Sequence, residues 1–94
     1  MAATSGQITV TTAGTEVQGP SVTGNGFFIR ALSGNTGKVY VGNDGADAVS
    51  STTGYELAAG DQVYIECGNL NLLWFDAATS GDKFSWLKAD DGSI

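Results

Sequence analysis

Histidine does not occur in this chain of 94 residues, and cysteine and proline occur once each. Without histidine, neither a Ser-His-Asp triad nor a Cys-His nucleophile pair can form, and the usual zinc ligand sets are missing as well. The lone Cys67 cannot close a disulfide within the chain, so stability must come from an apolar core or from oligomerisation. The composition therefore predicts a protein that is not an enzyme and that holds no cofactor.

Basic residues are also scarce, because only four of them stand against ten acidic residues and the formal net charge is −6. This charge opposes contact with the phosphates of nucleic acid and with anionic lipid. No apolar run approaches the ~20 residues that cross a bilayer, and the start MAATSGQITV lacks the features of a secretory signal. We expect no nucleic-acid partner, no membrane partner, and synthesis in the cytoplasm.

Short runs rich in β-branched and aromatic residues make up most of the sequence, and each run ends in Gly, Asn, Asp or Ser. No segment sustains a helical apolar period over ten positions. The pattern predicts an all-β fold, a single antiparallel β-sandwich of about eight short strands that is jelly-roll-like. Residues 7–94 would form this domain, and residues 1–6 a flexible N-terminal arm. The strands are expected near residues 7–12, 15–18, 26–32, 38–42, 54–57, 62–67, 71–76 and 83–88.

Alternation along these runs predicts which side chains enter the core. In QVYIEC the apolar set is Val63, Ile65 and Cys67, and by the same parity the other strands contribute Ile8, Val10, Val39, Val41, Phe84 and Trp86. The glycine-rich segments between the runs, such as SGNTG at residues 33–37, are interpreted as turns rather than as ligand-binding loops.

The run LLWF at residues 72–75 breaks the alternation, because Leu73 and Phe75 fill one face of a strand while Leu72 and Trp74 fill the other. One explanation is a central strand whose outer side is covered by the long loop near residues 43–54 or by the chain termini. The second is an apolar patch that another subunit buries. The third is sugar stacking on an exposed Trp74 or Tyr64. The patch would consist of Tyr40, Tyr64, Leu72 and Trp74.

Acidic residues offer two further candidate sites. The segment 43–47, NDGAD, has oxygen ligands at close spacing but lacks the later glutamate of a calcium loop, so solvated turn carboxylates are the preferred interpretation. Asp76 and Asp82 flank a turn, and a carboxylate pair could in principle hydrolyse a glycosidic bond. Carboxylates in such turns ordinarily accept backbone hydrogen bonds, and we expect no catalytic residue and no metal site.

Two single residues complete the candidates. Cys67 has inward parity and is expected to pack as a small apolar residue rather than act as a reactive thiol. Arg30 is the only arginine, and its place between Phe28 and Leu32 on one strand face indicates an exposed stem or a pair with an acidic group at an interface.

The segments TTAGTEVQG, FFIRALSGNTGKVYVGNDG, GYELAAGDQVYIE and LLWFDAATSGDKFSWL together resemble small β-sandwich proteins of tailed bacteriophages, over roughly residues 8–88. Among these the chain is most similar to capsid decoration, or cement, proteins. The resemblance implies a non-enzymatic virion protein that binds the major capsid protein on the outer capsid surface and stabilises the shell, often as a homotrimer. No catalytic residue is carried over.

On this hypothesis, the aromatic patch defined above forms the subunit contact, and the N-terminal arm and the loop near residues 43–53 touch the shell. The expected shell contacts are Ala2, Ala3, Thr4, Ser5, Asn43 and Asp44. The alternative from another class is a carbohydrate-binding module of a phage tail or head appendage, in which exposed aromatics beside Asn and Asp bind host surface sugars.

Overall fold

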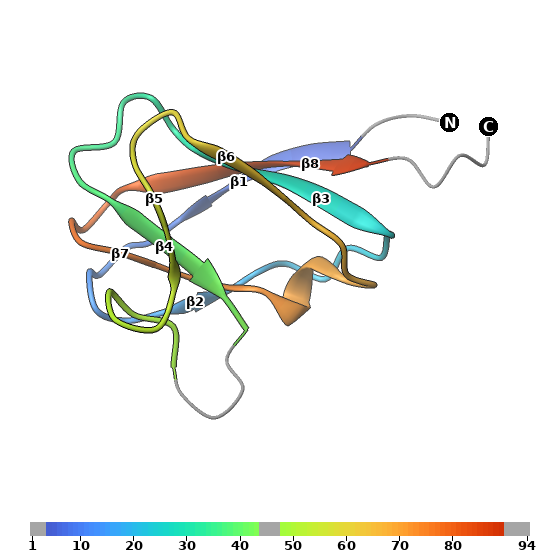
Figure 1. The fold of residues 1–94 in the computed structure, drawn as a ribbon, viewed down its shortest axis with the longest axis horizontal. Coiled ribbons are helices and arrows are strands. Elements are labelled where there is room, and N and C mark those ends of the chain that lie inside the picture. The colour runs from blue at the N-terminus through green and yellow to red at the C-terminus, as the bar shows by residue number, and fades with distance from the viewer. Residues whose placement is uncertain (1–3, 44–47, 90–94) are drawn as a thin grey trace.

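The structure is a computed structural model that describes residues 4–43 and 48–89. Within these residues the chain forms eight strands and one short 3-10 helix, η1 (Leu70–Leu72) (Figure 1). The strands are β1 (Thr4–Thr9), β2 (Val17–Gln18), β3 (Gly26–Ala31), β4 (Val39–Gly42), β5 (Tyr55–Leu57), β6 (Gln62–Ile65), β7 (Trp74–Ala77) and β8 (Lys83–Ala89). No helix in these ranges has the length and hydropathy needed to cross a membrane.

The strands form two antiparallel sheets of four strands each. The first sheet has the order β1-β8-β3-β6 and the second has the order β2-β7-β4-β5. Strand β1 therefore pairs with β8, β2 with β7, β3 with β6 and β4 with β5. The chain folds back on itself at the β4–β5 connection, and the resulting double strand is rolled into two sheets, which is the arrangement of a jelly roll. The predicted all-β sandwich is confirmed.

The core lies between the two sheets and contains the side chains that alternation assigned to it. Of these, Val10, Val39 and Phe84 are completely buried, and so are Phe27, Ile29, Leu70 and Phe75, which alternation did not assign. The rings of Phe75 on β7 and Phe84 on β8 meet edge to face, with centroids 4.7 Å apart, and so join the second sheet to the first. Val63 and Ile65 on the edge strand β6, and Cys67 just after it, pack against the same core but stay partly exposed.

The expected flexible arm over residues 1–6 is wrong for residues 4–6. Thr4, Ser5 and Gly6 form the first half of β1 and pair with Lys88, Leu87 and Trp86 of β8. Gly6 makes this possible, because a Cβ at this position would lie 2.9 Å from Cζ2 of the Trp86 indole. Residues 1–3 lie outside the described residues.

The seventh strand also begins later than expected, at Trp74 rather than residue 71. The side chain of Asn69 caps η1: its Oδ1 accepts hydrogen bonds from the backbone N–H of Asn71 at 3.0 Å and of Val22 at 3.1 Å. Leu72 thus belongs to a helical turn, where it is 48% exposed, and not to a strand.

Candidate functional site: the outer face of the first sheet

The outer face of the first sheet carries two parallel rows of side chains that run across all four strands. Residues that lie directly opposite each other in neighbouring strands point to the same side of a sheet. The register therefore places the members of each row side by side. The apolar row is Tyr64, Phe28, Leu87 and Ser5. The polar row is Gln62, Arg30, Ser85 and Gln7.

Aromatic side chains dominate the apolar row. The rings of Phe28 and Tyr64 are tilted against each other with centroids 4.8 Å apart. Tyr64 lies over Gly26, where an added Cβ would collide with the phenol ring. Tyr64 is 44% exposed and Leu87 is 42% exposed, so this row presents apolar surface to solvent. Burial of these side chains by a ligand or a partner would be favourable.

The polar row has one positive charge and no carboxylate. Nε of Arg30 donates to the carbonyl oxygen of Gly60 at 3.4 Å. Over residues 4–43 and 48–89, the single ion pair is Lys38–Glu56, with 3.0 Å between Nζ and Oε2, so Arg30 has no acidic partner there. No hydrogen bond to another described residue is made by the side chains of Gln7, Gln62 and Ser85. A guanidinium, two amides and a hydroxyl are thus available to a ligand.

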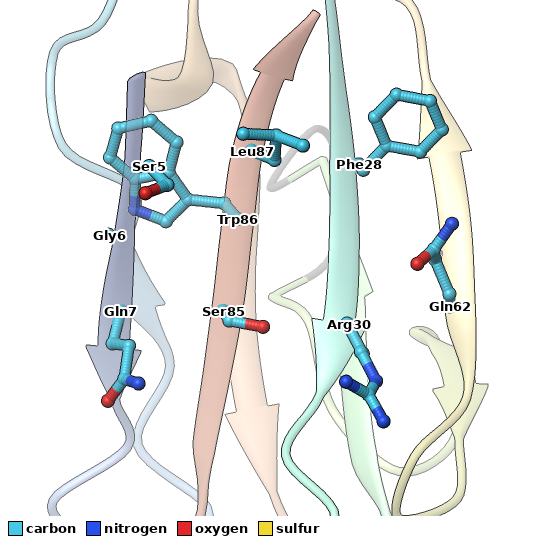
Figure 2. A pocket seen from close by; sticks show the side chains of 9 residues that line it. All are labelled: Ser5, Gly6, Gln7, Phe28, Arg30, Gln62, Ser85, Trp86 and Leu87. Carbon is cyan, nitrogen blue, oxygen red and sulfur yellow. The ribbon is translucent and has the colours of Figure 1, made fainter. Parts of the chain in front are cut away.

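The two rows border a shallow hollow with a volume of about 650 Å³. Its lining includes Ser5, Gln7, Phe28, Arg30, Gln62, Ser85 and Leu87, while Gly6 and Trp86 complete it between β1 and β8 (Figure 2). Volumes of roughly 300–1,000 Å³ are typical of small-molecule sites. Figure 2 shows the long side chains of Gln7, Arg30 and Gln62 on one side of the hollow and Phe28 and Leu87 on the other.

A second exposed apolar surface lies along one side of the sandwich. Strands β5 and β6 are edge strands of different sheets, and the short turn at residues 58–61 joins them, so they border the same side. Tyr55 lies opposite the buried Val41, yet it is 62% exposed because β5 is the edge strand of the second sheet. We call this side of the sandwich, which carries the exposed Tyr55 on β5 and the partly buried Val63 and Ile65 on β6, the open edge.

The predicted aromatic patch does not form one surface. Tyr64 belongs to the first sheet and Trp74, which is half-buried, to the second, while the exposed Leu72 lies on η1. The expectation that Tyr40 is exposed is wrong, because only 6% of this residue is accessible.

Tyr40 does point away from the core, but the segment 48–54 covers it. Val49 of this segment is buried, and its backbone N–H donates to Oε1 of Glu16 at 2.8 Å. A Cβ on Gly54 would lie 2.6 Å from Cβ of Tyr40, which shows how closely the segment packs. The segment that follows β4 therefore covers the outer face of this strand at Tyr40.

The predicted shell contacts are divided between the two sheets. Thr4 and Ser5 are exposed on β1 of the first sheet, and Ser5 is a member of the apolar row. Asn43 is exposed just after β4 of the second sheet, and its Nδ2 donates to the carbonyl oxygen of Leu72 at 3.1 Å. Ala2, Ala3 and Asp44 lie outside the described residues.

Both candidate catalytic carboxylates are buried and bound to backbone N–H groups. Asp82 accepts hydrogen bonds from Thr36 at 3.0 Å and from Gly37 at 2.9 Å, which fixes the glycine-rich turn at residues 33–37. Asp76 accepts from Gly14 at 3.0 Å and from Ala77 at 2.8 Å. Neither residue lines the hollow. These contacts favour the structural role that was expected for carboxylates in turns.

Two sequence candidates remain, the thiol of Cys67 and the acidic segment 43–47. Cys67 packs against the core, its thiol donates to the carbonyl oxygen of Asn69 at 3.5 Å, and burial raises the pKa of the thiol above its ordinary value. A thiol with a raised pKa is a poor nucleophile near neutral pH. Among the described residues no cluster of acidic residues or cysteines could hold a metal ion, and most of the segment 43–47 lies outside them.

Sequence reasoning missed most residues of the hollow, although it singled out Arg30 as a candidate and Ser5 as a shell contact. The lining comes from β1, β3, β6 and β8, and only the register of non-consecutive strands brings these residues together. Comparisons with protein-family models, curated proteins and solved structures find no match to this chain.

Proposed function

We propose that this chain is a non-enzymatic structural protein of a tailed-bacteriophage virion, which decorates the outer capsid surface and stabilises it as a homo-oligomer. The open edge supports self-association most directly. Tyr55, Val63 and Ile65 present apolar surface beside the unpaired backbone groups of two edge strands. Exposed edges of this kind bind other chains readily, and burial of the apolar side chains stabilises the contact.

The resemblance of four segments to phage decoration proteins supports the virion location and the choice of a trimer. The jelly-roll arrangement of the strands is compatible with this choice, because viral capsid domains commonly have it, as do lectin domains. In our proposal the major capsid protein contacts the end of the second sheet, where Leu72 is exposed and Asn43 bonds to its backbone. This contact leaves the open edge free for neighbouring subunits.

The Tyr55→Ser variant tests the subunit contact. Light scattering of the wild-type chain at high micromolar concentration should give three times the 9.6 kDa chain mass, and the variant should give the monomer mass. Loss of a mostly exposed ring should leave the fold intact, since exposed substitutions change stability by only ~0.5 kcal/mol. A monomeric wild type, or a variant that remains trimeric, would contradict the open-edge contact.

The Leu72→Ser variant is the matched control and tests the shell contact. It removes an apolar side chain that is also exposed, but from η1, so it should remain trimeric and bind less well to capsids that lack this chain. A cryo-electron microscopy map of the source virion checks the location itself. Many copies on the outer shell are expected, and absence of the chain from the particle would overturn the proposed function.

A further inference from the structure

We propose that the hollow on the outer face of the first sheet binds a carboxylated saccharide, with Arg30 holding the carboxylate. This inference does not depend on decoration or on the oligomeric state, because the hollow is complete within one chain. Its lining contains no residue of the open edge and neither Leu72 nor Asn43. A decorating trimer could therefore present three such hollows to the surroundings of the virion.

The positive charge of Arg30 in the hollow favours a ligand that carries an acidic group. The chain has a net charge of −6, yet the lining of the hollow holds one arginine and no aspartate or glutamate. Arg30 meets no carboxylate within the described ranges, and its one hydrogen bond uses Nε. A guanidinium binds a carboxylate through charge-assisted hydrogen bonds, which are about twice as strong as neutral ones. A carboxylate is thus the group that this arginine fits.

The neutral groups beside Arg30 fit sugar hydroxyls. Gln7, Gln62 and Ser85 supply donors and acceptors, and none of these side chains is bonded elsewhere in the described part of the chain. Amide and hydroxyl groups can each donate and accept, as sugar hydroxyls do. Neighbouring strands lie ~4.8 Å apart, so the four-membered polar row extends over roughly 14 Å, which is longer than one sugar ring.

The apolar row fits the carbon-bound face of a sugar ring. Phe28 and Leu87 line the hollow across from the polar row, and Tyr64 holds the Phe28 ring from the side. This combination of a few polar groups with an apolar wall is typical of small-molecule sites. A protein partner of standard size would bury about 800 Å² on each side, which requires far more surface than this hollow offers.

The test uses the full chain and three acidic probes: tetragalacturonate, tetramannuronate and sialyllactose. Calorimetry measures affinity, and ¹⁵N–¹H NMR spectra locate the site. At least one probe should bind and shift the amide signals of Gln7, Arg30 and Ser85. Its methyl ester, which has the same shape without the charge, should bind at least roughly tenfold more weakly, because a charge-assisted hydrogen bond contributes ~1.5–3 kcal/mol.

Two variants complete the experiment. Arg30→Gln should lose at least roughly tenfold in affinity for the acidic probe and should no longer distinguish it from the ester. Lys38→Gln removes the same charge from a residue next to the second sheet and should bind like the wild type. Failure of all three probes to bind would overturn the proposal, as would unchanged affinity in Arg30→Gln or amide shifts confined to other surfaces.

The oligomeric state is measured separately on the same samples. Monomeric Tyr55→Ser should keep the saccharide affinity of the wild type, so failure of the saccharide site and failure of the trimer are distinguishable. An aspartate-rich peptide serves as the competing class of ligand. If this peptide binds the hollow and the saccharides do not, the saccharide proposal is wrong.

Discussion

Asp82 shows, at the scale of the single residue, how this chain uses buried charge. Each carboxylate oxygen accepts one backbone hydrogen bond from the turn at residues 33–37, and the residue is almost entirely buried. The same turn is held by Asn35, whose side chain accepts from the backbone N–H of Lys83 at 2.9 Å and donates to its carbonyl at 2.8 Å. The glycine-rich turn therefore owes its shape to two side chains.

The Asp82→Asn variant should lower the free energy of unfolding by about 2–3 kcal/mol. The amide keeps one acceptor oxygen but turns an NH₂ group toward a backbone N–H, and it also removes the charge from the remaining hydrogen bond. Urea denaturation measures the loss. Asp61→Asn is the control, because exposed Asp61 accepts one turn hydrogen bond, from Ala58 at 2.9 Å, and should lose under ~1 kcal/mol. Equal losses in the two variants would contradict this account.

At the scale of the element, β1 is the instructive strand because its first half contains small and polar residues. Of Thr4, Ser5 and Gly6 only Thr4 favours a strand, so in isolation this small, polar segment resembles an arm. They join the sheet because they can pair with β8 on the side away from β3. In addition, the indole of Trp86 lies against the position where Gly6 has no side chain. Tertiary packing here overrides local propensity.

The Gly6→Val variant should destabilise the protein by about 1–3 kcal/mol, the usual cost of overpacking, and should change the fluorescence of Trp86. The added side chain meets the indole and forces either Trp86 or β1 to move. Ser5→Val, one residue earlier on the outer face, is the matched control and should stay within about 0.5 kcal/mol of wild type. A Gly6→Val variant as stable as the control would mean that β1 does not pack on Trp86.

The strands themselves could be predicted from the sequence, while the surfaces could not. Alternation in QVYIEC and KVYVG assigns Val63, Val39 and Val41 to the core, because successive side chains within one strand point to opposite faces of the sheet. Exposure of Tyr40 depends on whether the following segment 48–54 folds over it, which the alternation of a single strand does not specify. The hollow requires the register of β1 against β8 and of β3 against β6, and no feature of a single strand specifies that pairing.

At the scale of the whole molecule, large core side chains hold the two sheets together by packing between them. Phe75 and Phe84 are fully buried and touch across the interior with an edge-to-face geometry. Aromatic pairs of this kind contribute about 0.5–1.5 kcal/mol beyond the area that they bury. A domain of this size has only ~5–15 kcal/mol of stability in total, so one such contact is a substantial part of it.

A double-mutant cycle on Phe75→Leu and Phe84→Leu should give a coupling energy of about 0.5–1.5 kcal/mol in denaturant unfolding. Each single variant keeps an apolar side chain but removes the ring contact. The pair Phe75→Leu and Ile8→Val serves as a control, because both residues belong to the core but form no ring pair. Strict additivity of the Phe75 and Phe84 variants would show that the rings do not couple the sheets.

The position of β8 between β1 and β3 also determines when this protein can fold during its synthesis. In the first sheet β1 pairs with β8 alone, and β3 pairs with β8 and with β6. Strand β1 is made before the other seven strands that the structure describes, yet its partner β8 is absent until residues 83–89 have left the ribosome. Likewise β2 must wait for β7. Strands β1 and β2 thus remain unpaired while most of the sandwich is made, and folding requires contacts between residues distant in sequence, which is the slow regime for small domains.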